Sequence, residues 1–236
     1  MPILQRHPEM RVLHDFAKDE SGARALAILL PGALQQPEDF IEAGFAAAVR
    51  KRGLPLDLAL LDFGLEFIGQ AADGSCLPLL DEQVMQAQWH RKYQHVWLVG
   101  ISIGAVIAID YADRYPGRVD GLCLLAPYPG NRMTTGEIAA AGGLRLWLPG
   151  AVADNDAERR VWRWLKARRG QTAGVRIHLG FGREDRFAAG HRLMAQAQIA
   201  DSVDTVAGGH AWPVWRALWD NFLDQGALFS AQRGAQ

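Results

Sequence analysis

The chain has 236 residues, 49% of them hydrophobic and 22% charged, a composition typical of a globular domain with a full core. Its 25 lysine and arginine residues are balanced by 26 aspartate and glutamate residues, for a net charge of -1. A dedicated nucleic-acid binder needs a basic surface, so this balance argues against that class. We therefore expect a single ordered domain over residues 1–236 that does not bind nucleic acid.

The cysteines and the apolar runs bear on the compartment. Cys76 and Cys123 are too few for a disulfide framework and form no CxxC pair. The charged stretch from Met1 to Asp15 lacks the apolar centre of a signal peptide, and no apolar run approaches the roughly 20 residues that a membrane span needs. We expect a cytoplasmic protein with no membrane span.

Apolar runs alternate with amphipathic stretches, and this alternation predicts the secondary structure. The predicted strands cover residues 11–16, 25–30, 56–61, 95–100, 119–126, 175–181 and 202–207. The predicted helices cover residues 38–52, 81–93, 103–115, about 156–169, 188–199 and 212–225. Because parallel strands need crossovers of this length, the pattern predicts an α/β fold, a doubly wound, mostly parallel sheet flanked by helices. Residues 130–174 hold no predicted strand and are interpreted as a lid insertion within the same domain.

The sequence Gly100-Ile101-Ser102-Ile103-Gly104 lies where a predicted strand ends and a predicted helix begins. This is the context of a G-x-S-x-G turn, which holds a serine in a strained conformation with its hydroxyl exposed. The flanking glycines avoid collisions with neighbouring backbone, and the helix N-terminus favours negative charge at the site. The chain contains only five serines, so a chance match in this context is improbable.

A serine hydroxyl needs a base, and histidine has a suitable pKa. Of the seven histidines, His210 follows the last predicted strand in the turn Gly208-Gly209-His210, where doubly wound sheets gather functional groups. A carboxylate should orient the imidazole from a loop between Ser102 and His210. Asp185 in the sequence GREDRF is the preferred candidate, because it lies farther past its strand than the alternative, Glu184.

These motifs resemble the α/β-hydrolase superfamily in its serine esterase and thioesterase branches. The resemblance rests on the Ser102 turn, Asp185 and Gly208-Gly209-His210, in the family's order, and it extends over residues 11–225. It implies catalytic roles for Ser102, Asp185 and His210 in cleaving a carboxylic ester or thioester through an acyl-enzyme.

The resemblance also implies an oxyanion hole and a substrate pocket. The backbone N–H of Ile103 and that of Ala33, with Leu34 as the alternative to Ala33, are the expected oxyanion donors. Leu34, Tyr128 and Trp212 are expected to line the pocket, because they lie close to these motifs along the chain.

The remaining motifs concern cofactors and the alternative functions. The chain has no HExxH, no P-loop and no GxGxxG after a strand, so no metal, nucleotide or other cofactor is expected. The expected partner is a small-molecule acyl ester or thioester, and the oligomeric state is left open. Two alternatives remain: an acyltransferase or a C–C or amide hydrolase with the same residues, and a non-catalytic binding protein on the same fold.

Overall fold

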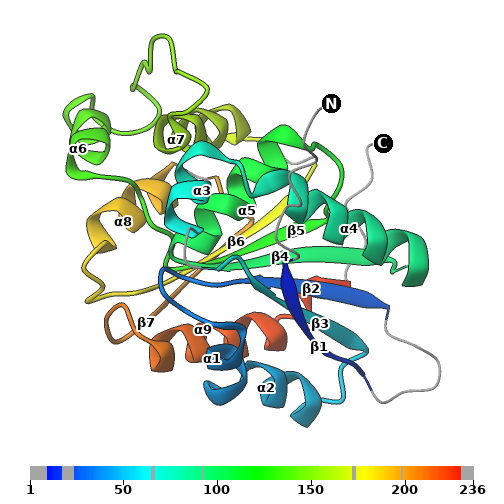
Figure 1. Cartoon of the computed structure of the whole chain (residues 1–236). Coiled ribbons are helices and arrows are strands. Elements are labelled where there is room, and N and C mark those ends of the chain that lie inside the picture. The colour runs from blue at the N-terminus through cyan, green and yellow to red at the C-terminus, as the bar shows by residue number, and fades with distance from the viewer. Residues whose placement is uncertain are drawn as a thin grey trace, which may run out of the picture.

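The structure, a computed structural model, describes residues 10–17, 24–64, 67–91, 93–171, 174–197 and 199–229 (Figure 1). Seven strands form one sheet: β1 (Arg11–Asp15), β2 (Ala25–Leu30), β3 (Leu56–Asp62), β4 (His95–Ile101), β5 (Gly121–Leu125), β6 (Arg176–Gly182) and β7 (Ser202–Val206). Their order is β1-β3-β2-β4-β5-β6-β7. Only β1 is antiparallel to its neighbour. The predicted mostly parallel α/β sheet is therefore confirmed.

Helices cover both faces of this sheet (Figure 1). One face carries α1 (Pro37–Glu42), α2 (Phe45–Lys51) and α9 (Trp212–Asp224), with a short 3-10 turn at Ala227–Phe229. The other face carries α3 (Phe67–Asp73), α4 (Leu77–Arg91), α5 (Ile103–Arg114), α6 (Arg132–Ala140), α7 (Ala157–Arg168) and α8 (Ala188–Gln196). Within the described residues, no helix has the length and apolarity to cross a membrane.

Alternation along the strands divides the core into two layers. In β2, Ala25, Ala27 and Leu29 face the layer of α1, α2 and α9, whereas Leu26, Ile28 and Leu30 face the layer of α3 to α8. All six side chains are buried, as the uninterrupted apolar sequence of this strand predicts. A sheet buried on both faces fixes the strand ends rigidly, and these ends carry the loops of the site.

One predicted helix is wrong, and two observed helices are missing from the prediction. The helix predicted over 38–52 is broken into α1 and α2, because Gly44 adopts a left-handed φ of 83°. A Cβ atom at Gly44 would lie 2.2 Å from the Arg216 guanidinium, so the break also makes room for a contact from α9. Helices α3 and α6 were not predicted. Helix α6 begins at the cap residue Asn131, whose side chain accepts hydrogen bonds from the N–H groups of Met133 and Thr134.

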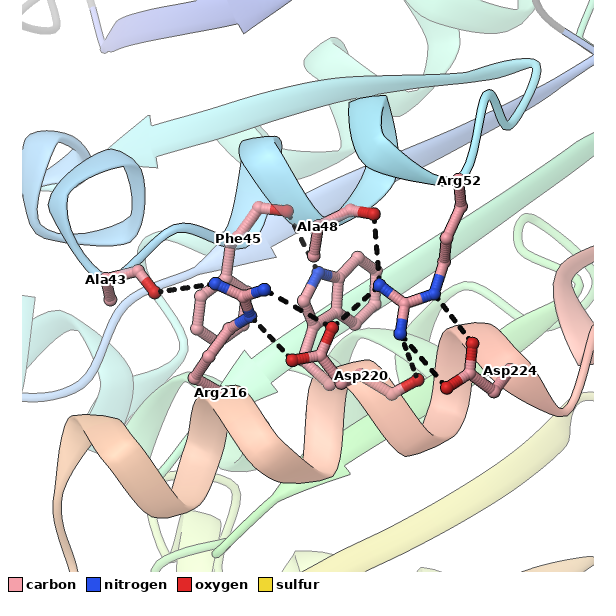
Figure 2. A network of polar contacts seen from close by, with 8 residues as sticks. Ala43, Phe45, Ala48, Arg52, Arg216, Asp220 and Asp224 are labelled. Atoms are coloured by element: carbon pink, nitrogen blue, oxygen red, sulfur yellow. Dashed lines mark hydrogen bonds and ion pairs between the residues drawn. The ribbon is translucent and has the colours of Figure 1, made fainter.

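A polar network joins α2 to α9 (Figure 2). The Arg52 guanidinium donates to Asp220 at 2.7 Å, to Asp224 at 2.7 and 3.0 Å, and to the carbonyl of Ala48 at 3.1 Å. Arg216 pairs with Asp220 at 2.9 Å and donates to the carbonyl of Ala43 at 3.2 Å. The network therefore fixes α2 and the residues that flank it against α9.

The two helices between β5 and β6, α6 and α7, lie on the face of α5 (Figure 1). A buried ion pair ties α7 to α5: Arg160 donates to the two carboxylate oxygens of Asp110 at 2.5 and 3.2 Å. The side chains are 5% and 2% exposed, so removing one partner leaves an uncompensated buried charge.

We predict that Asp110→Asn lowers the free energy of unfolding by about 3 kcal/mol, because Arg160 would keep its charge in a buried site. Urea unfolding monitored by circular dichroism measures the loss. Asp224→Asn is the matched control, because Asp224 is 62% exposed and its loss should cost under about 1 kcal/mol. Equal losses in the two variants would contradict the assignment of the Asp110–Arg160 pair as the anchor of α7.

Candidate active site

Ser102 occupies a strained turn between β4 and α5. Its φ of 53° and ψ of -112° lie in a region that side chains rarely adopt. A Cβ atom at Gly104 would lie 2.3 Å from the carbonyl oxygen of Leu30 and 2.5 Å from that of Pro31. A Cβ atom at Gly100 would lie 2.5 Å from the backbone of the first turn of α5. Both glycines are therefore sterically required, as the sequence analysis proposed.

Two backbone hydrogen bonds hold the turn in place. The N–H of Ser102 donates to the carbonyl of Leu125 at 3.0 Å, and the carbonyl of Ser102 accepts from the N–H of Tyr128 at 3.0 Å. The turn is thus bonded to β5 and to the loop that follows it, which compensates for part of its strain.

The structure brings Ser102, His210 and Asp185 together, although they are far apart in the sequence. His210 Nδ1 lies 2.8 Å from Asp185 Oδ2, and His210 Nε2 lies 3.0 Å from Ser102 Oγ. An ionised carboxylate only accepts, so Nδ1 carries the proton and donates to Asp185. Nε2 is then the acceptor for the Ser102 hydroxyl, which is the arrangement of a nucleophile paired with an oriented base.

Asp185 and Glu184 contact the histidine loop in different ways. Asp185 is buried and also accepts from the N–H of Phe187 at 2.8 Å. Burial raises the pKa of Asp185, but the hydrogen bonds from His210 and Phe187 outweigh this effect, and the pKa lies below its ordinary value. Glu184 is exposed and accepts from the backbone N–H of Gly208. Asp185 contacts the imidazole, whereas Glu184 holds the loop that carries it.

Aromatic rings fix the imidazole of His210 from two sides. The ring of Phe187 meets it edge-on with centroids 5.1 Å apart, and the ring of Trp215 does so at the same distance. Neither aromatic residue was predicted at the site, although Phe187 belongs to the sequence GREDRF that contains Asp185. Its position two residues after the carboxylate was the available signal.

A cavity of about 350 Å³ opens at Ser102. This volume suits a small organic ligand. Its lining residues are Ala33, Ile68, Ala71, Ala72, Ser102, Ile103, Val106, Tyr128, Ala157, Glu158, Arg186 and Phe187. Another cavity, of about 230 Å³, lies among β2, β3 and α4 and has none of the Ser102, His210 or Asp185 side chains in its lining.

The predicted oxyanion and pocket residues fall into two groups. Ala33, Ile103 and Tyr128 line the cavity. Leu34 is 84% exposed, and the ring of Trp212 packs edge-on against Phe40. Leu34 and Trp212 are absent from the cavity lining, which corrects their assignment to the pocket.

The loop after β2 has a defined shape beside Ser102. The side-chain oxygen of Gln35 accepts from the N–H of Gly32 at 2.6 Å, and Leu34 adopts a positive φ of 62°. Ile103 is the first residue of α5, so its N–H has no carbonyl one turn earlier to bond. Ile103 and Ala33 both line the cavity beside Ser102.

Among the described residues, no group of three or more His, Cys, Asp or Glu side chains is placed to hold a metal ion. The site consists of a nucleophile candidate, a base, a carboxylate and an apolar cavity with few polar groups. Together with the sheet order, this set of groups defines the α/β-hydrolase class of ester hydrolases.

Comparisons with known proteins agree with this class. The family model Esterase, described as "Putative esterase", matches residues 75–223, more than half of the chain. The chain belongs to this esterase family and is a hydrolase that acts on ester bonds. The matched range contains Ser102, Asp185 and His210. A search of curated proteins found no match.

Solved structures share the fold at low sequence identity. Est1E from Butyrivibrio proteoclasticus is 17% identical over 92% of this chain and 95% of that chain, with a TM-score of 0.62. A monoacylglycerol lipase from Paleococcus ferrophilus is 12% identical over 92% and 98%, with a TM-score of 0.61. An S-formylglutathione hydrolase from Staphylococcus aureus is 10% identical over 86% and 81%, with a TM-score of 0.64. These likenesses establish the α/β-hydrolase fold.

Two further histidines, His178 and His191, are buried and do not contact Ser102 or Asp185 through hydrogen bonds. His191 Nε2 donates to the carbonyl of Pro127 at 2.8 Å, and His178 Nδ1 lies 2.7 Å from Ser202 Oγ. Burial lowers the pKa of each from 6.5 to about 4. Both rings are therefore neutral in the folded protein at neutral pH.

We predict that stability falls as pH falls from about 6.5 towards 4. In this window the unfolded chain binds protons at His178 and His191 that the folded chain does not, so the free energy of unfolding rises with pH. Between pH 4 and pH 6.5, each histidine changes the free energy of unfolding by up to about 3 kcal/mol. Urea midpoints at pH 7.5, 6 and 5 measure the slope. A His191→Gln variant should show a shallower slope, and an unchanged slope would contradict this assignment.

Proposed function

We propose that the protein is a serine hydrolase that cleaves a carboxylic ester or thioester through an acyl-enzyme intermediate. The observation that carries the proposal is the pair of hydrogen bonds that joins Ser102 to His210 and His210 to Asp185. In the first step, Ser102 Oγ attacks the substrate carbonyl while His210 Nε2 accepts its proton. His210 then gives this proton to the leaving alcohol or thiol.

Asp185 acts through His210 in both steps. Its ionised carboxylate keeps the proton of the neutral imidazole on Nδ1 and stabilises the imidazolium that forms during attack. The lowered pKa of Asp185 supports this role, because the group stays ionised at neutral pH. Water activated by His210 then attacks the acyl-enzyme and regenerates Ser102.

The negative charge on the carbonyl oxygen is assigned to two backbone donors. The N–H groups of Ile103 and Ala33 are the proposed oxyanion hole, since both residues line the cavity beside Ser102. The N-terminus of α5 adds a favourable field at the same point. Each donor is expected to contribute about 3 kcal/mol to stabilising the transition state.

The relatives support both ester and thioester substrates. The similar structures include one protein named a monoacylglycerol lipase and another named an S-formylglutathione hydrolase, and the second name denotes a thioester. The cavity of about 350 Å³ fits a substrate portion of modest size.

We predict that a fluorophosphonate probe adds once to the native chain and not to Ser102→Ala. Intact mass spectrometry measures the adduct, and circular dichroism verifies that both proteins are folded. Aryl esters and acyl thioesters of increasing chain length then identify the preferred substrate. A folded native chain that forms no adduct and cleaves none of these substrates would overturn the proposal in favour of a binding protein.

We predict that Asp185→Asn lowers kcat about 10³- to 10⁴-fold with little change in KM, because the imidazole would be held in the wrong tautomer. Steady-state kinetics on an aryl ester measure the change. Glu184→Gln is the matched control, because the neighbouring carboxylate contacts only the histidine loop, and it should lose under about tenfold. A larger loss of kcat in Glu184→Gln than in Asp185→Asn would reverse the assignment of the two carboxylates.

A further inference from the structure

The cavity at Ser102 has a polar pair on one wall that the proposed reaction does not use. Tyr128 follows β5, and Glu158 lies in the first turn of α7. Both line the cavity, and the remaining lining residues around them are mostly apolar. Rings connect this wall to the reacting groups, because Phe187 contacts His210 at 5.1 Å and Tyr128 at 5.5 Å between centroids.

The hydrogen bonds of Glu158 leave one of its oxygens largely open. Oε2 accepts from the N–H of Asn131 at 3.0 Å and from the hydroxyl of Thr134 at 2.9 Å. Oε1 accepts only from the Tyr128 hydroxyl among the described residues, at the long distance of 3.3 Å. A carboxylate offers about four acceptor positions, so Oε1 retains capacity for another donor.

Tyr128 has no proton left to offer. A phenol carries a single O–H, and that of Tyr128 is donated to Glu158. Burial, together with the neighbouring Glu158 carboxylate, raises the pKa of Tyr128, so the phenol keeps its proton at neutral pH. While this bond to Glu158 is kept, the Tyr128 oxygen can only accept from a ligand. The pair of Tyr128 and Glu158, the acceptor pair below, presents acceptors and no donors to the cavity.

We propose that the acceptor pair selects substrates that carry a hydrogen-bond donor, a hydroxyl or an ammonium group, on the portion of the ester that fills the cavity. This inference rests on the proposed hydrolase function and names its substrate class. An apolar substrate would cover these half-buried acceptors without supplying a donor, and a methoxy or keto group would bring an acceptor against acceptors, so both are disfavoured. Among the described residues Glu158 makes no ion pair, and Arg186, the cation in the cavity lining, lies over the ring of Phe187, so the Glu158 charge stays available to an ammonium group.

The test compares matched esters that differ only in the donor. Methyl 3-phenylpropanoates and phenylacetates with para hydroxyl, methyl, methoxy or aminomethyl groups place the donor on the acyl side at two lengths. 2-Arylethyl acetates with para hydroxyl or methyl place it on the alcohol side. Hydroxyl and methyl are nearly equal in size, so the ratio of their kcat/KM values reports the hydrogen bond. The ammonium arm distinguishes a charged donor from a neutral one.

In the native protein we expect the hydroxyl or ammonium ester to exceed its methyl counterpart about tenfold or more in kcat/KM, mainly through KM, in at least one series. Tyr128→Phe keeps the ring against Phe187 but removes one of the two acceptors, so the hydroxyl-to-methyl ratio should fall about threefold or more while Glu158 Oε1 still accepts from an ammonium group. Tyr115→Phe is the matched control, because Tyr115 stacks on Tyr111 outside the cavity lining and the ratio should be unchanged. Glu158→Gln should remove the ammonium preference more than the hydroxyl preference.

The outcomes separate the two proposals. Cleavage of all para-substituted esters at equal efficiency, or a donor preference that is unchanged in both Tyr128→Phe and Glu158→Gln, overturns this inference while the serine hydrolase stands. A parallel fall of the hydroxyl and methyl rates in Tyr128→Phe, with the ratio unchanged, assigns the pair a structural role and also overturns it. If the native chain cleaves no ester and Ser102 forms no fluorophosphonate adduct, the proposed function itself fails.

Discussion

The close approach of helix α5 to the end of β2 is the constraint on which the site depends. The carbonyl oxygens of Leu30 and Pro31 would lie 2.3 and 2.5 Å from any Cβ atom at position 104, so only glycine permits this contact. It presses the first turn of α5 against the loop that contains Ala33. From β2 the chain continues to β3 on one side of β2 and then to β4 on its other side, so the sheet has a switch point between β2 and β4. The loop with Ala33 follows β2 and the Ser102 turn follows β4, so the two flank this point. The cavity opens at this point.

The groups around the cavity are supported by two different kinds of contact. Ser102, His210 and Asp185 stand at strand ends of a sheet buried on both faces, and hydrogen bonds with the backbone of Leu125 and Phe187 hold two of them. The wall formed by Tyr128 and Glu158 depends instead on side-chain contacts of α7. Glu158 bonds to Tyr128, 30 residues away, and its helix is anchored by the Arg160–Asp110 pair, 50 residues apart. The proposed chemistry and the proposed selectivity thus rest on separate sets of interactions.

The sequence predicted the features that depend on local pattern. The strand at 25–30 was predicted to the residue, because its run of apolar side chains ends at Pro31-Gly32. Ser102, Asp185 and His210 were found because each lies at the end of a strand in a recognisable turn. The single helix predicted at 38–52 was wrong, because Phe40, Phe45 and Val49 keep helical spacing across a break that only the left-handed Gly44 reveals. Gly44 is the local signal for this break, whereas the contact with Arg216 at the same point arises only in the folded chain.

The pocket residues were the least predictable part, and the reason is physical. In the sequence, Glu158 is an acidic residue in the first turn of a helix, and the helix dipole alone explains that position. Its contact with Tyr128 arises only when the segment between β5 and β6 folds back over α5. Trp212 shows the opposite error: it lies two residues from His210 in sequence, yet its ring packs against Phe40 in the other core layer. Proximity along the chain therefore locates groups that share one turn, whereas the cavity wall that contains Glu158 is set by how α7 docks on α5.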